Sequence, residues 1–239
     1  MGRLFGLLLL FGGISLVQAG WGQEAGAVKN DLVLISRADA GSSGVYIEKA
    51  QKALTEAGVL FDTLTQEQAT ASALAPYQAA MLPLNTFSPE LEGALSSFVS
   101  SGGKLIVFYT ASPAVAHLVG IESLTYTSPE YDGQFTEIVQ SAEPVPGAPS
   151  VVRFNSWNVF APTLLPSARV VGEWRAAAGK LTGIPALVES PAGFYVGHVL
   201  TGVDGEAQAR LIGALIAQVA PKAWKGALER RAARALKLG

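Results

Sequence analysis

Few side chains in this sequence of 239 residues could carry covalent or acid–base chemistry. There is no cysteine, which excludes disulfides, thiolate metal sites and a cysteine nucleophile. The two histidines, His117 and His198, leave little for a histidine-rich metal site, and we expect neither a metal nor a cofactor. His198 ends a predicted strand and could carry a proton or contact a ligand, with a structural, backbone-bonded histidine as the alternative. His117 lies inside a predicted helix, where a structural role is expected.

Three further polar side chains follow predicted strands. Arg37, Asn85 and Thr110 come after the first, third and fourth of these strands. Open α/β sheets bind ligands at the carboxyl edge of their strands, so these residues and His198 are expected to rim one pocket and bind a ligand there. The alternatives are a surface ion pair for Arg37 and a turn-forming role for Asn85.

The elements that would position these side chains alternate between strands and helices. Short apolar runs predict buried strands at 31–36, 59–64, 79–83 and 104–109. Helical periodicity and Ser-Pro starts predict helices at 45–57, 88–101 and 112–119, and residues 66–75 are expected to form a short helix or a turn. This alternation is typical of parallel βαβ units with helices on both faces of the sheet. We therefore expect an α/β fold.

The pattern changes after Gly120. Short β-branched runs separated by proline and glycine predict an antiparallel β-rich extension of the parallel sheet through residue 200. An amphipathic helix is predicted at 205–219, broken by Pro221, and a last basic helix or linker follows within 221–239. Residues 31–220 would then form one domain. The β-rich region also carries aromatics that either pack in the core or stack on sugars: Tyr126, Tyr131, Trp157, Phe160 and Trp174.

The amino-terminal segment is typical of a secretory signal. Arg3 precedes an uncharged run of 14 residues, and Val17-Gln18-Ala19 precedes a potential cleavage site. We expect residues 1–19 to be a signal peptide and 20–30 a flexible leader, with a secreted or periplasmic mature protein. An uncleaved amino-terminal anchor is the alternative. No later segment is long and apolar enough to predict a membrane span.

Charge is distributed unevenly along the chain. The formal net charge is −2, but residues 222–237 contain six Lys or Arg and one acid. Residues 20–221 contain 10 basic and 18 acidic residues, a net of −8, which argues against nucleic acid as a partner. The basic run could meet phosphates or anionic lipid, or it could be the solvated face of a terminal helix.

Two segments resemble class I glutamine amidotransferase-like domains. One is Gly102-Gly-Lys-Leu-Ile-Val-Phe-Tyr-Thr-Ala-Ser-Pro-Ala-Val-Ala-His-Leu-Val-Gly120, which resembles the strand, sharp turn and helix around the nucleophile. The other is Gly193-Phe-Tyr-Val-Gly-His-Val199 with the helix at 205–216, which resembles the late strand and closing helix. The chain is most similar to domains that precede family-10-like glycoside hydrolase domains in exported bacterial proteins, and more loosely to the ThuA-like group. The resemblance implies a flavodoxin-like, mainly parallel sheet.

The residues required for glutaminase chemistry are incomplete. The resemblance places the nucleophile at about Thr110, with Tyr109 as the one-residue alternative, and matches His198 to the catalytic histidine. The acid that should orient this histidine falls at Leu200. A triad needs nucleophile, base and orienting acid together, and a neutral hydroxyl does not replace a thiolate. We therefore expect no glutaminase activity.

The combined expectation is an exported, non-catalytic amidotransferase-like domain with a binding or scaffolding role linked to carbohydrate processing. Its partner would be a carbohydrate or a glycoside hydrolase-like domain. One alternative is a hydrolase of another reaction type that uses His198 as general base. Another is an envelope protein-interaction module, which would require the helix at 224–238 to project from the body.

Overall fold

The computed structural model describes residues 30–37, 41, 44–83 and 86–238. The predicted signal peptide, nearly all of the predicted leader, and Asn85 lie outside the described residues. The described residues form a mixed nine-stranded sheet, a separate two-stranded sheet and six helices. The α/β expectation is confirmed at this level.

Five parallel strands form one half of the large sheet, in the order β2-β1-β3-β4-β11. Their bounds are β1 (Leu32–Ser36), β2 (Asp62–Thr65), β3 (Ala79–Leu82), β4 (Lys104–Phe108) and β11 (Gly193–Val196). All residues of β3 and β11 are buried, as expected for strands that are covered on both faces. The second strand begins three residues later than its apolar run predicts, because Val59 packs in the loop after the helix.

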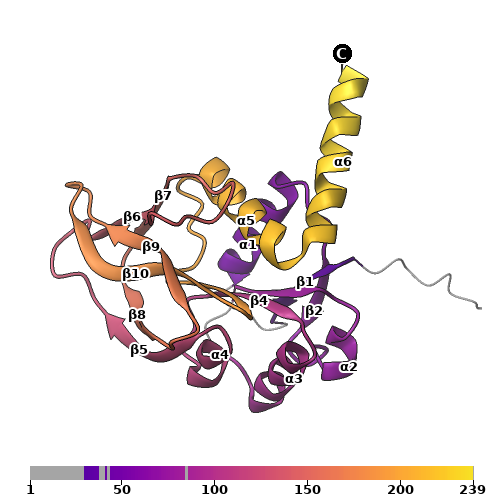
Figure 1. The fold of residues 1–239 in the computed structure, drawn as a ribbon, viewed down its shortest axis with the longest axis horizontal. Helices are drawn as coiled ribbons and strands as arrows, with labels where there is room; N and C mark the ends of the chain where they lie inside the picture. The colour runs from indigo at the N-terminus through magenta and orange to yellow at the C-terminus, as the bar shows by residue number, and fades with distance from the viewer. Residues whose placement is uncertain (1–29, 38–40, 42–43, 84–85, 239) are drawn as a thin grey trace, which may run out of the picture.

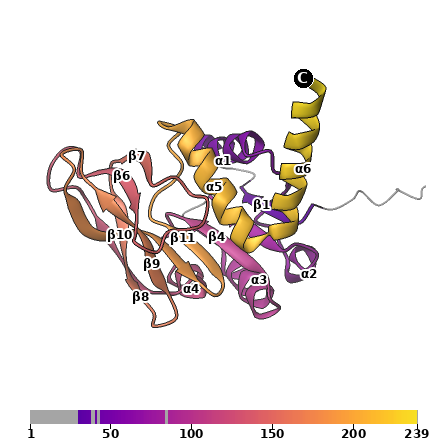
Figure 2. The ribbon, with the colours of Figure 1, turned by 45° about the horizontal axis from the view of Figure 1, so that its top comes forward.

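Helices cover both faces of this parallel half (Figures 1 and 2). On one face lie α1 (Gly44–Glu56) and α5 (Gly205–Val219), which contact each other. On the other lie α2 (Ala71–Leu74), α3 (Pro89–Ser100) and α4 (Pro113–Leu118). The Ser-Pro starts are confirmed, because Ser88 and Ser112 accept capping hydrogen bonds from the amides of Leu91 and Val115.

Antiparallel strands extend the sheet beyond β11. They are β10 (Leu181–Ser190), β9 (Arg169–Arg175), β6 (Phe135–Gln140) and β7 (Val151–Ser156). A separate antiparallel pair joins β5 (Ile121–Thr127) to β8 (Val159–Leu164). The β8 strand contains Pro162, a residue that an edge strand tolerates. The Tyr195 hydroxyl donates to the carbonyl of Phe160 at 3.0 Å and ties β8 to the main sheet.

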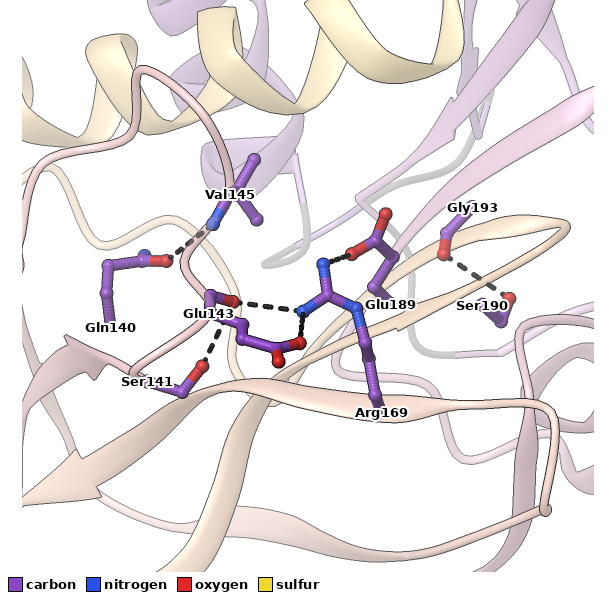
Figure 3. A network of polar contacts seen from close by, with 8 residues as sticks. All are labelled: Gln140, Ser141, Glu143, Val145, Arg169, Glu189, Ser190 and Gly193. Carbon is purple, nitrogen blue, oxygen red and sulfur yellow. Dashed lines mark hydrogen bonds and ion pairs between the residues drawn. The ribbon is translucent and has the colours of Figure 1, made fainter.

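An exposed polar network connects the antiparallel strands (Figure 3). The Arg169 guanidinium donates to the carbonyl and the carboxylate of Glu143, at 3.0 and 3.3 Å, and pairs with Glu189. Beside it, the Ser190 hydroxyl donates to the carbonyl of Gly193 at 3.3 Å. These contacts join β9, β10 and the loop after β6 near the amino end of β11. Exposed pairs of this kind contribute little free energy each, so the network aligns strands more than it stabilises them.

The last helix, α6 (Pro221–Leu238), buries side chains against the body in its first half, and Arg230 and Arg231 farther along hydrogen-bond to the body. It begins at Pro221, three residues before the predicted start, since proline fits the first turn of a helix. Ala223 and Ala227 are buried, and Trp224 packs against Gly213 of α5. Residues 228–237 are exposed, and this half projects from the body (Figures 1 and 2). Among the described residues, no helix combines the length and hydropathy needed to cross a bilayer.

Candidate functional site

The predicted site residues that the structure describes lie at the carboxyl edge of the parallel strands, in two groups. Arg37 follows β1, and its guanidinium donates to the hydroxyl of Thr86, which follows β3, at 3.1 Å. Thr110 and His198 follow β4 and β11, which are adjacent strands. The ends of β1 and β11 are separated by three strand spacings, or about 14 Å. Arg37 therefore groups with the segment after β3, and Thr110 groups with His198.

The His198 side chain is fully buried. Its Nδ1 lies 3.1 Å from the carbonyl oxygen of Val199. A carbonyl can only accept, so Nδ1 carries the proton and Nε2 presents a lone pair. Within the described part of the chain, Nε2 has no hydrogen-bond partner. Burial lowers the pKa of His198 to about 4, against the opposing effect of the Val199 carbonyl, so the imidazole is neutral near pH 7.

The sharp turn between β4 and α4 is made by Tyr109. Its φ of 41° is left-handed, a conformation that costs a non-glycine residue roughly 1–2 kcal/mol. The left-handed residue of this turn is therefore Tyr109, which the sequence offered as the one-residue alternative to Thr110. The Thr110 side chain is fully buried, and its hydroxyl oxygen accepts from the amide of Ser112 at 3.0 Å. Thr110 thus supports the turn, as Ser and Thr side chains commonly do.

The Tyr109 phenol is held in place by the β7–β8 turn and the small sheet. Its hydroxyl donates to the Oδ1 atom of Asn158, and the Asn158 amide donates to the hydroxyl of Tyr126 at 2.8 Å. Burial raises the pKa of Tyr109, and the nearby phenols of Tyr126 and Tyr46 raise it further. A neutral, hydrogen-bonded phenol at the turn is poorly suited to act as a nucleophile.

The rings of Tyr109 and Trp157 contact His198. With the rings that contact them in turn they form what we call the edge cluster: Tyr46, Tyr109, Tyr126, Trp157 and Phe160. The Trp157 ring lies 4.3 Å from the His198 ring, nearly perpendicular to it, and 6.2 Å from the ring of Tyr46. Trp157 and Tyr126 remain 50% and 56% exposed, whereas Trp174 is fully buried against Phe135 and Phe154. The β-rich aromatics are thus divided between core and surface.

Backbone and side-chain contacts hold the segments that carry Trp157 and His198. Asn155, at φ 49°, is left-handed just before the turn that carries Trp157. The buried Gln208 amide of α5 donates to the carbonyl of Arg153 and to the hydroxyl of Thr201, three residues after His198, at 2.9 and 3.1 Å. The Lys49 ammonium donates to the Thr201 carbonyl at 2.6 Å. The segment after β11 is therefore fixed by α1 and α5.

Sequence reasoning missed Tyr46 and Asn158 because both act through contacts across long sequence separations. The only local signal is the run Asn155-Ser-Trp-Asn158, in which polar turn-forming residues flank a tryptophan. Among the described residues, no group of His, Cys, Asp and Glu side chains is arranged to hold a metal ion. The site therefore consists of a neutral histidine with an acceptor nitrogen, packed against the half-exposed ring of Trp157.

Comparison with known proteins defines the fold. No family model matches the sequence, and no curated protein matches it. A solved structure described as ThuA-like, from Bacteroides uniformis, superposes with a TM-score of 0.61 at 15% identity, covering 81% of this chain and 93% of that chain.

Two larger proteins contain a similar unit. α-L-Fucosidase isoenzyme 2 from Paenibacillus thiaminolyticus gives a TM-score of 0.54 at 15% identity, covering 80% of this chain and 33% of that one. A GH42 β-galactosidase from G. stearothermophilus gives 0.57 at 13% identity, covering 79% and 30%. The chain therefore shares its α/β fold with a ThuA-like protein and with about a third of two glycosidases.

Proposed function

We propose that this protein is an exported, non-catalytic amidotransferase-like domain that binds neutral carbohydrate at the edge cluster. The observation that carries the proposal is the half-exposed Trp157 ring, which packs against a buried histidine whose Nε2 has no hydrogen-bond partner among the residues that the structure describes. Sugar rings present C–H faces that stack on aromatic side chains and hydroxyl groups that donate hydrogen bonds.

The electrostatics of the site favour an uncharged ligand. His198 is neutral near pH 7 and can accept a hydrogen bond at Nε2, which a ligand hydroxyl would donate. A carboxylate has no proton to donate there at neutral pH. Because a buried unpaired acceptor costs about 1–3 kcal/mol, a ligand hydroxyl that reaches Nε2 when the Trp157 ring moves aside would recover part of that free energy.

Three features support a role without catalysis. The residue at the turn after β4 is a tyrosine whose hydroxyl is bound to Asn158. The position expected for the triad acid is Leu200, which is buried. The hydrolase alternative needs His198 as a general base, and a base is most effective when its pKa lies near the working pH. A pKa of about 4 makes His198 a weak one.

The fold, the similar structures and the amino-terminal sequence support the amidotransferase-like, flavodoxin-like, carbohydrate-linked and exported parts of the proposal. The strand, left-handed turn and helix at β4–Tyr109–α4 agree with the arrangement that the resemblance implies. The similar structures include an α-L-fucosidase and a β-galactosidase, which are enzymes named for sugars. Export rests on the signal-like amino terminus, and a secreted or periplasmic protein would meet extracellular glycans.

A glycan array, followed by thermal-shift measurements with the sugars that bind, tests the proposal on residues 20–239. A sugar that binds the folded state raises the melting temperature in proportion to its affinity. We expect Trp157→Ala to abolish the shift and Trp157→Phe to retain part of it. Tyr131→Ala is the matched control, because Tyr131 is 48% exposed and makes none of the edge-cluster ring contacts. No stabilisation by any sugar, with His198→Ala equally silent, would refute the proposal.

A further inference from the structure

A second candidate site lies between α6 and the turn that joins α1 to β2, and it shares no residue with the edge cluster. It is a groove of about 250 Å³. Arg230, Arg231 and Arg234 line one side, and residues 58–61 line the other. We call it the arginine groove.

Contacts with the body fix two of the three guanidinium groups. Arg230 donates to the carbonyl of Gly58 at 3.0 Å, and Arg231 donates to the carbonyl of Glu56 at 3.2 Å. The Arg231 guanidinium also lies 5.4 Å from the centre of the Trp224 ring. Each guanidinium has five N–H donors, and each of these backbone hydrogen bonds uses one of them. The other N–H groups of Arg230 and Arg231 are therefore held at the groove, where they can donate hydrogen bonds to a ligand.

The positive charge of the groove is not balanced locally. Among the described residues, none of the three arginines forms an ion pair with a carboxylate. The ion pairs of this region are Lys52–Glu56 and Lys225–Glu229, at 3.7 and 3.9 Å, and both are exposed. Residues 222–237 carry six cations against one acid, whereas residues 20–221 carry a net charge of −8. The chain thus has one basic end on an acidic body.

Exposed leucines gather at the same end. Four leucines of the described residues are exposed, and three belong to this region: Leu60 at 52% on the groove, and Leu228 at 48% and Leu236 at 84% on α6. The fourth, Leu181, is 51% exposed on β10. Cations alone would suit any anion, but cations beside exposed leucines suit an anion that is joined to an apolar body.

We propose that α6 and the arginine groove dock the protein on an anionic phospholipid membrane. Arginine forks match the oxygens of phosphate groups, so a lipid headgroup occupies the groove while the leucines enter the interface. The acidic body is repelled by the same surface, which orients the projecting half of α6 toward the membrane. This docking does not depend on sugar binding at the edge cluster.

Vesicle co-sedimentation of residues 20–239 tests the docking. We expect binding to vesicles of phosphatidylglycerol and phosphatidylcholine, no binding to phosphatidylcholine alone, and release at high salt. Each neutralised cation should weaken binding about fivefold, so Arg234→Gln loses about fivefold and Arg234→Gln with Lys237→Gln about 25-fold. Lys180→Gln, an exposed cation in the β9–β10 turn, is the matched control and should change nothing.

Two further measurements test the exposed leucines and the binding of free phosphate. Leu60→Ser should weaken vesicle binding, whereas Leu181→Ser, a leucine of nearly equal exposure, should not. Inorganic phosphate alone is tested by thermal shift. A phosphate-dependent shift without vesicle binding would replace the membrane with a small free anion and overturn the proposal. Vesicle binding that survives the loss of Arg234 and Lys237 would overturn it as well.

Discussion

The parallel and antiparallel halves of this molecule contribute differently to the candidate site. The parallel half supplies a buried frame that places His198 and the Tyr109 turn at one edge. The β-rich half supplies Trp157, Asn158 and Tyr126, the side chains that face solvent or hold those that do. If the proposed site is correct, the α/β frame sets its position and the appended strands set which side chains a ligand would meet there. The following predictions test this division, beginning with the largest expected effect.

The frame should be intolerant at Gly193. Its φ is 133°, and a Cβ there would lie 1.9 Å from the backbone oxygen of Leu105 on the neighbouring strand. Gly193→Ala should lower the free energy of unfolding by about 5 kcal/mol, measured by urea denaturation. Gly179 in the β-rich half also has a positive φ but open space around it, so Gly179→Ala should cost only about 1 kcal/mol. Equal losses of unfolding free energy in the two variants would show that the close approach of Leu105 does not require glycine at position 193.

The two tryptophans of the β-rich half should separate stability from recognition. Trp174→Ala removes a fully buried ring and should cost about 3–5 kcal/mol in unfolding free energy. Trp157→Ala removes a half-exposed ring and should cost about 1 kcal/mol while abolishing sugar binding. Chemical denaturation and calorimetric titration check the pair. A loss of stability at Trp157 as large as that at Trp174 would place Trp157 in the core.

His198 should make stability depend on pH. Its pKa is about 4 in the folded state and about 6.5 when unfolded, so the unfolded state binds more protons between these values. The contribution of His198 to the free energy of unfolding is therefore complete above pH 6.5. It falls by roughly 3 kcal/mol as the pH is lowered to about 4. The difference between wild type and His198→Gln across this range isolates the effect from carboxylate titration. Parallel stability profiles for the two proteins would contradict the low pKa.

Backbone strain at Tyr109 gives the smallest effect. Tyr109→Ala and Tyr109→Gly both remove the ring, but only glycine adopts a φ of 41° without strain. The glycine variant should therefore be more stable than the alanine variant by about 1 kcal/mol in thermal or chemical denaturation. An alanine variant that is the more stable of the two would show that the turn is not held in the left-handed region.

The parallel half could be predicted from sequence because its strands are continuous apolar runs and its helices have clear Ser-Pro starts. The choice between Thr110 and Tyr109 could not be made in advance, since a one-residue shift in a turn is decided by backbone dihedrals. The edge cluster was equally hidden, because Tyr46 and Trp157 meet only after the chain folds. Ligand binding at the proposed site would therefore depend on contacts that no local sequence pattern encodes.

The imidazole nitrogen resonances of His198, followed by NMR during titration with a sugar that the array identifies, test the central claim most directly. We expect the free protein to show the neutral tautomer with the proton on Nδ1. Saturating sugar should shift the Nε2 resonance and leave Nδ1 protonated, and Trp157→Ala should remove this response. Saturable binding that leaves both His198 resonances unchanged would place the sugar elsewhere and contradict the account.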